Sequence, residues 1–233
     1  MTYNVFIDGE EGTTGLQIRE RLETRSEISL IHLGDSKRKS AEARRTALVA
    51  ADVAILCLPD AASREAVKLV EGEDSRLIDA SSAHRTANGW VYGFPEMVPE
   101  QRSQILKANR VTNPGCYPTG AIALLAPLIS GGLLPVDYPV TINAVSGYSG
   151  GGKPLIARME DRKSENAISS EYFAYGLGLE HKHTPEILKH SGLQNRPLFV
   201  PSVGKFRQGM IVQVPLQLWA VPGKPSVAAI FEM

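Results

Sequence analysis

The first half of the chain alternates short apolar runs with amphipathic stretches. Four runs have the length of buried strands, at residues 4–8, 27–34, 53–59 and 76–81. Residues 15–23 and 62–71 repeat apolar side chains at the spacing of a helix. Strands that are apolar throughout are typical of a sheet covered on both faces. The alternation therefore predicts an α/β domain with a parallel sheet wound by helices.

The second half has a different pattern. Residues 117–130 predict a long helix, and residues 139–152 begin as a strand and end in glycines. Residues 210–221 are rich in β-formers and alternate in part, which indicates a long strand. We therefore expect an α+β domain on an antiparallel or mixed sheet, with domains at 1–115 and 116–233.

The last ten residues, KPSVAAIFEM, begin like a helix with Ser226 as its N-cap. The helical pattern ends after about two turns of 3.6 residues. We therefore expect this chain to be a fragment of a longer protein.

Charge and composition exclude several classes of protein. The 25 Lys and Arg residues balance the 25 Asp and Glu residues, which argues against electrostatic binding to nucleic acid or to an anionic membrane. No apolar run is long enough to span a bilayer, and the N-terminus lacks the pattern of a secretion signal. Two cysteines are too few for a disulfide framework, so we expect a cytoplasmic protein with reduced thiols.

A glycine-rich turn joins the first predicted strand to the first helix. Gly9, Gly12 and Gly15 allow close approach of a ligand, and Thr13 and Thr14 add hydroxyls beside the N–H groups of the helix N-terminus. We expect the turn to bind the pyrophosphate of a dinucleotide, with its two glutamates pointing outward. The spacing differs from G-x-G-x-x-G, so a tight turn without a ligand is the alternative.

The end of the second predicted strand decides which dinucleotide fits. Asp35 suits the ribose 2′-OH of NAD, but Ser36, Lys37, Arg38 and Lys39 follow it directly. Three cations and a hydroxyl suit a phosphate dianion, so we expect NADP as the cofactor. A solvated basic loop is the alternative.

One of the two cysteines lies where a nucleophile would be activated. Cys116, in the stretch NPGCYPTG, directly precedes a predicted helix whose dipole favours a thiolate. Asn113 and the backbone amides after Cys116 are candidate donors to an oxyanion. Cys57 lies inside an apolar run, and we expect it to be buried in the core. A packing role for Cys116 is the alternative.

The stretch EHKHTPEI offers a base for this thiol. His181 and His183 would lie on one face of an extended chain, and Glu186 would orient one of them. Which histidine handles the proton stays open. We expect no metal, because the other three histidines are scattered and a third ligand is not evident. A surface histidine pair is the alternative.

Together these motifs resemble the N-acetyl-γ-glutamyl-phosphate reductase family, in particular its short form. The motifs that carry the resemblance are, in chain order, FIDGEEGTTGLQIRERL, CLPDAAS, IDASSAHR, VYGFPE, NPGCYPTG, AVSGYSGGGK, LEHKHTPEI and PSVGKFRQGM. The resemblance implies a Rossmann domain followed by a glyceraldehyde-3-phosphate-dehydrogenase-like α+β domain. It also implies NADPH-dependent reduction of N-acetyl-γ-glutamyl phosphate through a thioester on Cys116. We expect a homo-oligomer that acts on a small molecule and binds neither nucleic acid nor membrane.

Further site residues follow from the resemblance alone. It implies that Pro59 and the Ser81–Ser82 loop lie near the cofactor or the substrate. It also implies that the Gly147–Gly152 loop, with Gly150, lies near the nicotinamide. For the substrate it implies Asn113, Ser146 and Gly147, with Lys205 and Arg207 as candidates for the carboxylate and the phosphate. Members of the family normally continue past the position of Met233.

Three other functions stay open at this point. An aspartate-β-semialdehyde dehydrogenase would share the reaction type and the architecture, but the His181 and His183 pair followed by Thr-Pro-Glu argues against it. A catalytically dead NADP-binding module is disfavoured because Cys116 and both histidines are present. A cofactor-free cysteine hydrolase is disfavoured by the glycine turn.

Overall fold

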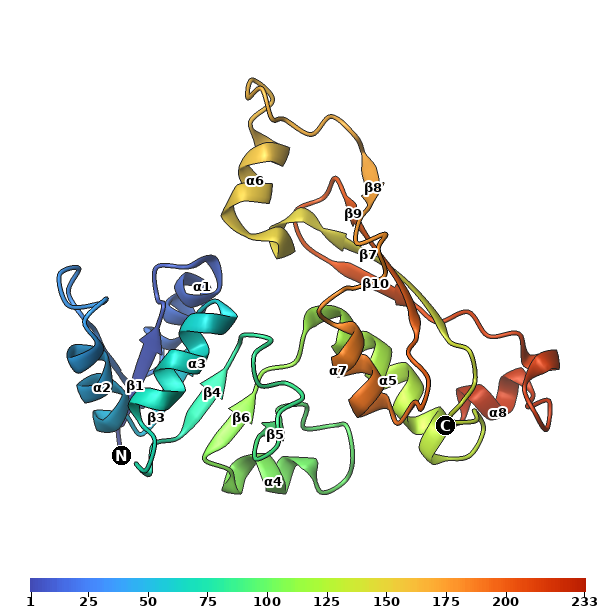
Figure 1. The fold of residues 1–233 in the computed structure, drawn as a ribbon, viewed down its shortest axis with the longest axis horizontal. Helices are drawn as coiled ribbons and strands as arrows, with labels where there is room; N and C mark the ends of the chain where they lie inside the picture. The colour runs from blue at the N-terminus through green and yellow to red at the C-terminus, as the bar shows by residue number, and fades with distance from the viewer. The chain divides into compact units, whose positions relative to one another are not determined.

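A computed structural model describes all residues from 1 to 233 (Figure 1). The chain divides into two compact units, Met1–Pro114 and Gly115–Met233. Each unit has its own sheet and its own hydrophobic core.

The first unit is built on a six-stranded sheet in the order β2-β1-β3-β4-β6-β5. All of its strand pairs are parallel. The strands are β1 Tyr3–Asp8, β2 Ile28–Ile31, β3 Val53–Leu56, β4 Leu77–Asp79, β5 Val91–Tyr92 and β6 Arg110–Thr112. The parallel sheet wound with helices is therefore confirmed.

Four helices accompany this sheet: α1 Thr13–Leu22, α2 Ala41–Ala50, α3 Asp60–Leu69 and α4 Gln101–Lys107. The connection from β1 to β2 runs toward one edge of the sheet, and the connections from β2 to β3 and from β3 to β4 run toward the opposite edge. Right-handed crossovers therefore place α1 on one face and α2 and α3 on the opposite face, where these two contact each other. Their buried side chains, among them Leu48 and Ala66, form the core with Phe6 and Leu56 of the sheet.

Helix α2 has no counterpart among the predicted elements. Ser40 is its N-cap, with its Oγ accepting the Ala43 N–H at 3.3 Å, a signal present in the sequence. The apolar repeat of α2 is interrupted because Arg44 lies on its buried side. The short elements α4, β5 and β6 have two to seven residues, too few to show a period.

The second unit contains a four-stranded sheet in the order β10-β7-β9-β8. The β7–β9 pair is parallel and the two outer pairs are antiparallel, so the expected mixed sheet is confirmed. The strands are β7 Thr141–Gly147, β8 Tyr172–Ala174, β9 Leu198–Gly204 and β10 Met210–Gln213. The α-helices are α5 Cys116–Ser130, α6 Gly152–Glu160, α7 Thr184–Ser191 and α8 Val227–Phe231, and two short 3₁₀ segments are η1 Tyr148–Gly151 and η2 Leu218–Ala220.

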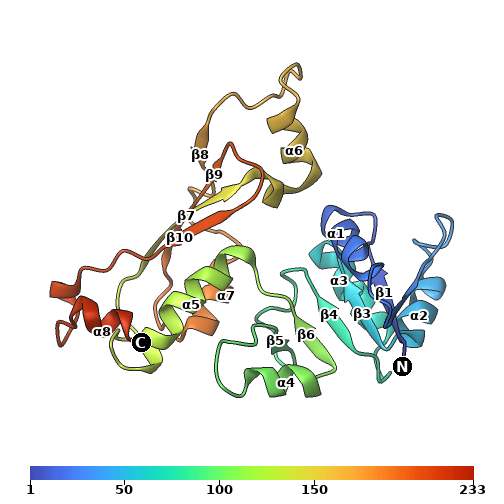
Figure 2. The ribbon, with the colours of Figure 1, turned by 180° about the vertical axis from the view of Figure 1, so that it is seen from behind.

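Helices α5 and α7 lie side by side, as Figures 1 and 2 both show. Tyr117, Ala121 and Leu125 of α5 pack with Ile187 of α7 and with Ile142 of β7 in one buried cluster. The packing fixes the N-terminal ends of both helices, which carry Cys116 and the histidine pair.

Two predictions for the end of the chain have different outcomes. The long strand predicted over 210–221 is wrong, because β10 ends at Gln213 and Pro215 cannot donate to a sheet ladder. The helix capped by Ser226 is confirmed, with the Ser226 Oγ accepting the Ala229 N–H at 3.1 Å. No helix in the structure has both the length and the apolar character needed to cross a membrane.

Candidate active site

The glycine turn after β1 is a tight loop. Gly9 has a φ of +93°, and a Cβ atom there would lie 2.4 Å from the carbonyl oxygen of Cys57. A Cβ atom on Gly15 would lie 2.3 Å from the carbonyl oxygen of Gly9. Glycine is therefore required at both positions. The rest of the predicted turn residues form the start of α1: Gly12 as its N-cap, then Thr13 and Thr14.

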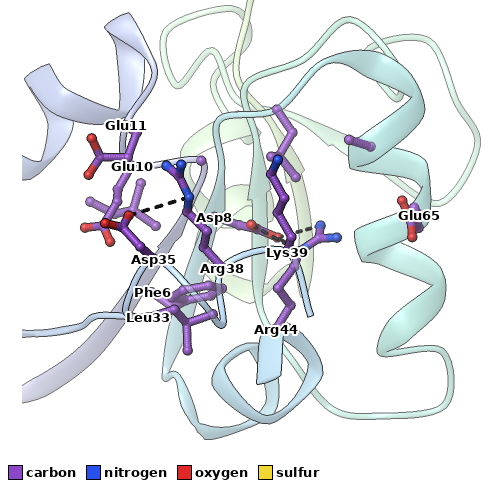
Figure 3. Close-up of a pocket in the computed structure, with 14 residues that line it drawn as sticks. Phe6, Asp8, Glu10, Glu11, Leu33, Asp35, Arg38, Lys39, Arg44 and Glu65 are labelled. Carbon is purple, nitrogen blue, oxygen red and sulfur yellow. Dashed lines mark hydrogen bonds and ion pairs between the residues drawn. The ribbon is translucent and has the colours of Figure 1, made fainter. Parts of the chain in front are cut away.

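A cavity of about 440 Å³ lies beside this turn (Figure 3). Its volume is in the range of small-molecule sites. Three cations, Arg38, Lys39 and Arg44, are among the lining residues, together with apolar side chains such as Phe6 and Leu33. A dinucleotide with an additional phosphate needs this combination of an apolar wall and cationic side chains, so the residues present fit NADP.

The predicted basic loop is divided between two cavities. Arg38 and Lys39 line the cavity beside the glycine turn, whereas Lys37 lines a separate one with residues of α2. Arg38 Nε lies 3.7 Å from Asp35 Oδ1, as a dashed line in Figure 3 shows. Ser36 is exposed in the same turn. Lys39 therefore fits the role of a cofactor-binding cation better than Lys37 does.

The glutamates of the turn do not point away from the cavity. Both Glu10 and Glu11 line it. Glu10 Oε2 lies 2.9 Å from His32 Nδ1 and 3.8 Å from Arg19 Nη1, and the same Arg19 nitrogen is 3.6 Å from Glu11 Oε1. The expectation that these glutamates face outward is wrong, because Arg19 of α1 and His32 offer them partners beside the cavity.

Asp8 and Arg44 form a buried ion pair in the wall of this cavity, and neither residue was predicted from the sequence. Arg44 Nη2 donates to Asp8 Oδ2 at 2.8 Å, and Arg44 Nε donates to the same oxygen at 3.1 Å. The two residues are 4% and 7% exposed. Burial raises the pKa of the Asp8 carboxyl, and Arg44 opposes this rise. Nothing in the sequence indicates that an Asp at the end of a strand and an Arg inside a later helix form an ion pair.

The end of β4 carries a second buried polar cluster. Asp79 Oδ2 accepts the Ser81 hydroxyl at 2.8 Å and lies 2.6 Å from Nδ1 of His84. The His84 ring stacks on Trp90 at a centroid distance of 4.3 Å. The Ser81 hydroxyl is thus held by the carboxylate that ends β4. Among the other predicted residues of this unit, Pro59 is the N-cap of α3, and Asn113 is exposed, with its carbonyl oxygen accepting from Arg85 Nε at 3.0 Å.

In the second unit, Cys116 is the first residue of α5 and is exposed. The N–H of Gly115, the N-cap of this helix, donates to Glu186 Oε1 at 2.7 Å. Glu186 is 1% exposed, so a buried carboxylate from α7 holds the backbone that precedes the thiol. The site at the N-terminus of α5 is therefore built by two helices that pack against each other.

Cys57 is half-buried, so the expectation that it is a buried core residue is wrong. It lies just past the end of β3, where its N–H donates to the Asp8 carbonyl oxygen at 2.8 Å. Burial, with a smaller effect of the Asp79 and Asp8 charges, raises the pKa of its thiol to about 11. This thiol is therefore protonated at neutral pH, as an unreactive cysteine is.

The two histidines of the HKH stretch are brought together, although not in the way predicted. His183 is the N-cap of α7 and has helical backbone angles, so the pair lies in a turn and not in an extended chain. The two imidazoles nevertheless meet at a centroid distance of 4.8 Å. Burial, and secondly the charge of Lys182, lower the pKa of His181.

Two tyrosines complete this group and were not predicted. The Tyr117 ring lies 6.1 Å from the His181 ring and 5.8 Å from the His183 ring. The Tyr117 hydroxyl is 2.8 Å from Ser146 Oγ and accepts the Tyr175 hydroxyl at 3.3 Å. Burial and the bond to Tyr117 raise the pKa of Tyr175, and the charge of Cys116 contributes to this rise. Tyr117 directly follows Cys116, so the thiol, the tyrosines and the imidazoles form one neighbourhood.

The remaining predicted residues of this unit lie at and after the end of β7. Ser146 and Gly147 are buried, and Gly150 is exposed in η1. Lys205 Nζ donates to Glu171 Oε1 at 2.7 Å, and Arg207 Nη1 donates to Glu160 Oε1 at 2.6 Å. Both cations predicted for the substrate therefore have carboxylate partners in this structure. No group of three or more His, Cys, Asp or Glu side chains is placed to hold a metal ion.

Family models match both units. The model described as semialdehyde dehydrogenase, NAD binding domain, matches residues 4–105, and the one described as semialdehyde dehydrogenase, dimerisation domain, matches residues 116–232. Fold and site thus define a member of the semialdehyde dehydrogenase class. Proteins of Brucella ovis and Brucella canis named N-acetyl-gamma-glutamyl-phosphate reductase are each 56% identical over 231 residues, covering 99% of this chain and 74% of theirs. The chain belongs to the N-acetyl-gamma-glutamyl-phosphate reductase family.

Solved structures agree on the fold. Aspartate semialdehyde dehydrogenase II of Vibrio cholerae has a TM-score of 0.65 at 15% identity, covering 96% of this chain and 78% of that protein. The Candida albicans enzyme, solved with NADP, has a TM-score of 0.62 at 12% identity, covering 100% of this chain and 75% of that protein. At these identities the likeness concerns the architecture alone.

Proposed function

We propose that this chain reduces N-acetyl-γ-glutamyl phosphate to N-acetylglutamate semialdehyde and phosphate, with NADPH as the reductant, in arginine biosynthesis. The observation that carries the proposal is the 56% identity to reductases of this name over 99% of the chain. An exposed cysteine at the start of α5, followed by a tyrosine whose ring contacts two imidazoles, is the group that such a reaction needs.

The chemistry begins at Cys116. Its thiolate attacks the acyl carbon, phosphate leaves, and the acyl group remains on sulfur as a thioester. When bound, NADPH would supply the hydride that reduces the thioester carbon to the aldehyde level. The carbon–sulfur bond then breaks, which releases the semialdehyde and returns the thiolate. The N-terminus of α5 stabilises the Cys116 thiolate both before it attacks the substrate and after the semialdehyde is released.

The other residues have supporting roles in this proposal. Gly9, Gly12 and Gly15 shape the turn for the pyrophosphate, and Arg38 with Lys39 receives the additional phosphate of NADP. Glu186 holds the backbone before Cys116 through the Gly115 N–H. The description of the second family model as a dimerisation domain supports a homo-oligomer. A cytoplasmic location remains a prediction from composition.

The proposal is tested in the reverse direction, with the semialdehyde, phosphate and NADP⁺ as reactants and NADPH absorbance as the readout. We expect NADPH to form only when phosphate or its analogue arsenate is present, because the thioester needs an acceptor. Aspartate semialdehyde is the matched control substrate. Absence of turnover, equal turnover of aspartate semialdehyde, or turnover without phosphate would each contradict the proposal.

The cofactor part of the proposal predicts a selective loss of NADPH affinity. In the Arg38→Ala/Lys39→Ala variant we expect the KM for NADPH to rise about tenfold, because charge-assisted contacts to phosphate are lost. The KM for NADH should change little. Lys37→Ala is the matched control, because this neighbouring cation lines a different cavity. If Lys37→Ala raises the KM for NADPH as much as the double variant does, the assignment of the phosphate to Arg38 and Lys39 is wrong.

A further inference from the structure

We propose that His181 acts as a neutral hydrogen-bond donor through Nε2 and stabilises the oxyanion formed when Cys116 attacks the acyl carbon. The inference depends on the proposed function for its substrate. It gives one of the two histidines a defined role, which the sequence leaves open.

The first argument is the hydrogen bond at the other ring nitrogen. The backbone N–H of His183 donates to His181 Nδ1 at 3.2 Å. A ring nitrogen that accepts a hydrogen bond carries no proton, so the neutral imidazole has its proton on Nε2. The N–H of Thr184 donates to the His181 carbonyl oxygen at 2.9 Å, so the turn leading into α7 holds both the ring and the backbone of this residue. The fold thereby selects one tautomer.

The surroundings of His181 favour the uncharged ring. The rings of Tyr117, Tyr175, Phe199 and His183 lie around it at centroid distances from 4.8 to 6.1 Å. Lys182 adds a positive charge next to it in the chain, and burial with this charge lowers the pKa of His181.

Carboxylates near His181 in the chain have other partners. Glu180 accepts from Arg196 Nη1 at 3.0 Å, and Glu186 accepts from the Gly115 N–H at 2.7 Å. Neither of these contacts stabilises an imidazolium at His181. Protonation of Nδ1 would also sacrifice the bond from the His183 N–H. A cationic His181 is therefore disfavoured by its contacts as well as by its burial.

The His181 ring contacts two tyrosines that lie near Cys116. Tyr117 follows Cys116 directly and contacts the His181 ring edge-on. Tyr175 contacts the same ring at 5.6 Å, and its hydroxyl lies within the electrostatic influence of Cys116. His181 Nε2 makes no hydrogen bond within the protein, and His181 is partly exposed, so this N–H is available to a substrate.

The first chemical step needs a donor of this kind. The electron pair of the Cys116 thiolate forms the carbon–sulfur bond, and the carbonyl π pair moves onto oxygen. Nε2–H of His181 donates a hydrogen bond to this oxygen and keeps its proton. The oxyanion pair then re-forms the carbonyl group, and phosphate leaves with the electrons of its bond to carbon. A neutral imidazole is sufficient for the step, as no proton is transferred.

Imidazole ¹⁵N NMR of the wild-type protein tests the tautomer without any substrate. Long-range ¹H–¹⁵N correlations distinguish protonated from unprotonated ring nitrogens, and the His181→Asn variant assigns the signals. We expect His181 to show an unprotonated Nδ1 and a protonated Nε2 at pH 7, and to gain a second proton only below pH 6.5. A proton on Nδ1, or a midpoint at or above pH 6.5, would overturn the proposal even if the enzyme is active.

A pair of amide variants tests the role in catalysis. The side-chain NH₂ of glutamine can take the position of Nε2–H, whereas that of asparagine lies nearer to Nδ1. Loss of one oxyanion donor costs about 10²–10³-fold in kcat, so we expect this loss in His181→Asn and a loss of at most about tenfold in His181→Gln. His190→Gln, on the last turn of α7, is the matched control and should leave kcat unchanged.

The two variants also distinguish a donor from a base. Neither amide can accept a proton at neutral pH, so equal and complete inactivation of both variants would show that His181 is the base and overturn the proposal. If the wild-type protein has the expected NMR signature but no reductase activity, the proposed function fails while the assigned tautomer stands.

Discussion

Replacing Cys116 by serine is expected to lower the rate of NADPH-dependent acyl phosphate reduction by at least about a thousandfold. A serine hydroxyl at the start of α5 is not ionised near neutral pH, so the nucleophile is lost while the shape of the site is kept. Because the dinucleotide cavity is formed by residues of the first unit, NADPH binding should be unchanged. Stopped-flow assays with the acyl phosphate, together with NADPH fluorescence titration, measure the two properties separately.

Cys57→Ser is the matched control for this substitution. The Cys57 thiol is half-buried and has its pKa raised to about 11, so it is not a nucleophile at neutral pH, and its variant should retain full activity. In the wild-type protein without NADPH, the acyl group should accumulate on Cys116 and be visible by mass spectrometry of the peptide. Activity retained in Cys116→Ser, or an acyl group found only on Cys57, would exclude the thioester route.

The sequence predicted the parallel sheet because short apolar runs alternate with amphipathic stretches, and β1 has four consecutive buried residues. Helix α2 was missed for the opposite reason, since Arg44 occupies a position on its buried side. An ionised group faces the interior there only because Asp8, 36 positions earlier in the chain, supplies its partner. A pairing over that distance is a property of the folded sheet and leaves no periodic signal.

In the candidate site, residue type was more predictable than geometry. Cys116, His181 and His183 could be selected because cysteine and histidine are scarce in this sequence, and Glu186 because it closely follows the two histidines. Glu186 is expected from the sequence to orient an imidazole, and its contact with the Gly115 N–H was not predicted. Tyr117 was hidden inside an apolar helix pattern, where an aromatic side chain gives no indication of its hydroxyl contacts. The tautomer of His181 depends on one backbone N–H and could not be predicted from spacing.

Replacing Arg44 by methionine is expected to destabilise the first unit by about 3–5 kcal/mol at pH 8, because the Asp8 carboxylate would remain buried without its partner. Methionine retains much of the apolar stem of arginine, so the loss of stability measures the missing charge more than the missing packing. Urea unfolding followed by Trp90 fluorescence, in a Trp219→Phe background, measures this unit, because Trp90 stacks on His84 within it.

The pH dependence of this effect has a defined sign. Burial raises the pKa of Asp8, so the folded state holds the proton more tightly than the unfolded chain does. The stability that this group contributes is fully present below its unfolded pKa of about 3.9 and is lost as pH rises through the folded pKa. Without Arg44 the folded pKa rises further. Arg44→Met should therefore be less destabilising at pH 5 than at pH 8.

Two variants distinguish the effect of breaking the buried ion pair from the effect of removing any arginine charge. Arg45→Met removes the adjacent arginine of α2, which pairs with Glu73 at the surface, and should cost no more than about 1 kcal/mol. The double variant Asp8→Asn/Arg44→Met removes both buried charges and should recover most of the stability lost in Arg44→Met. If Arg44→Met costs no more than Arg45→Met, or if the double variant is the least stable of the three, then Asp8 is not ionised in the folded protein and Arg44 stabilises α2 by packing alone.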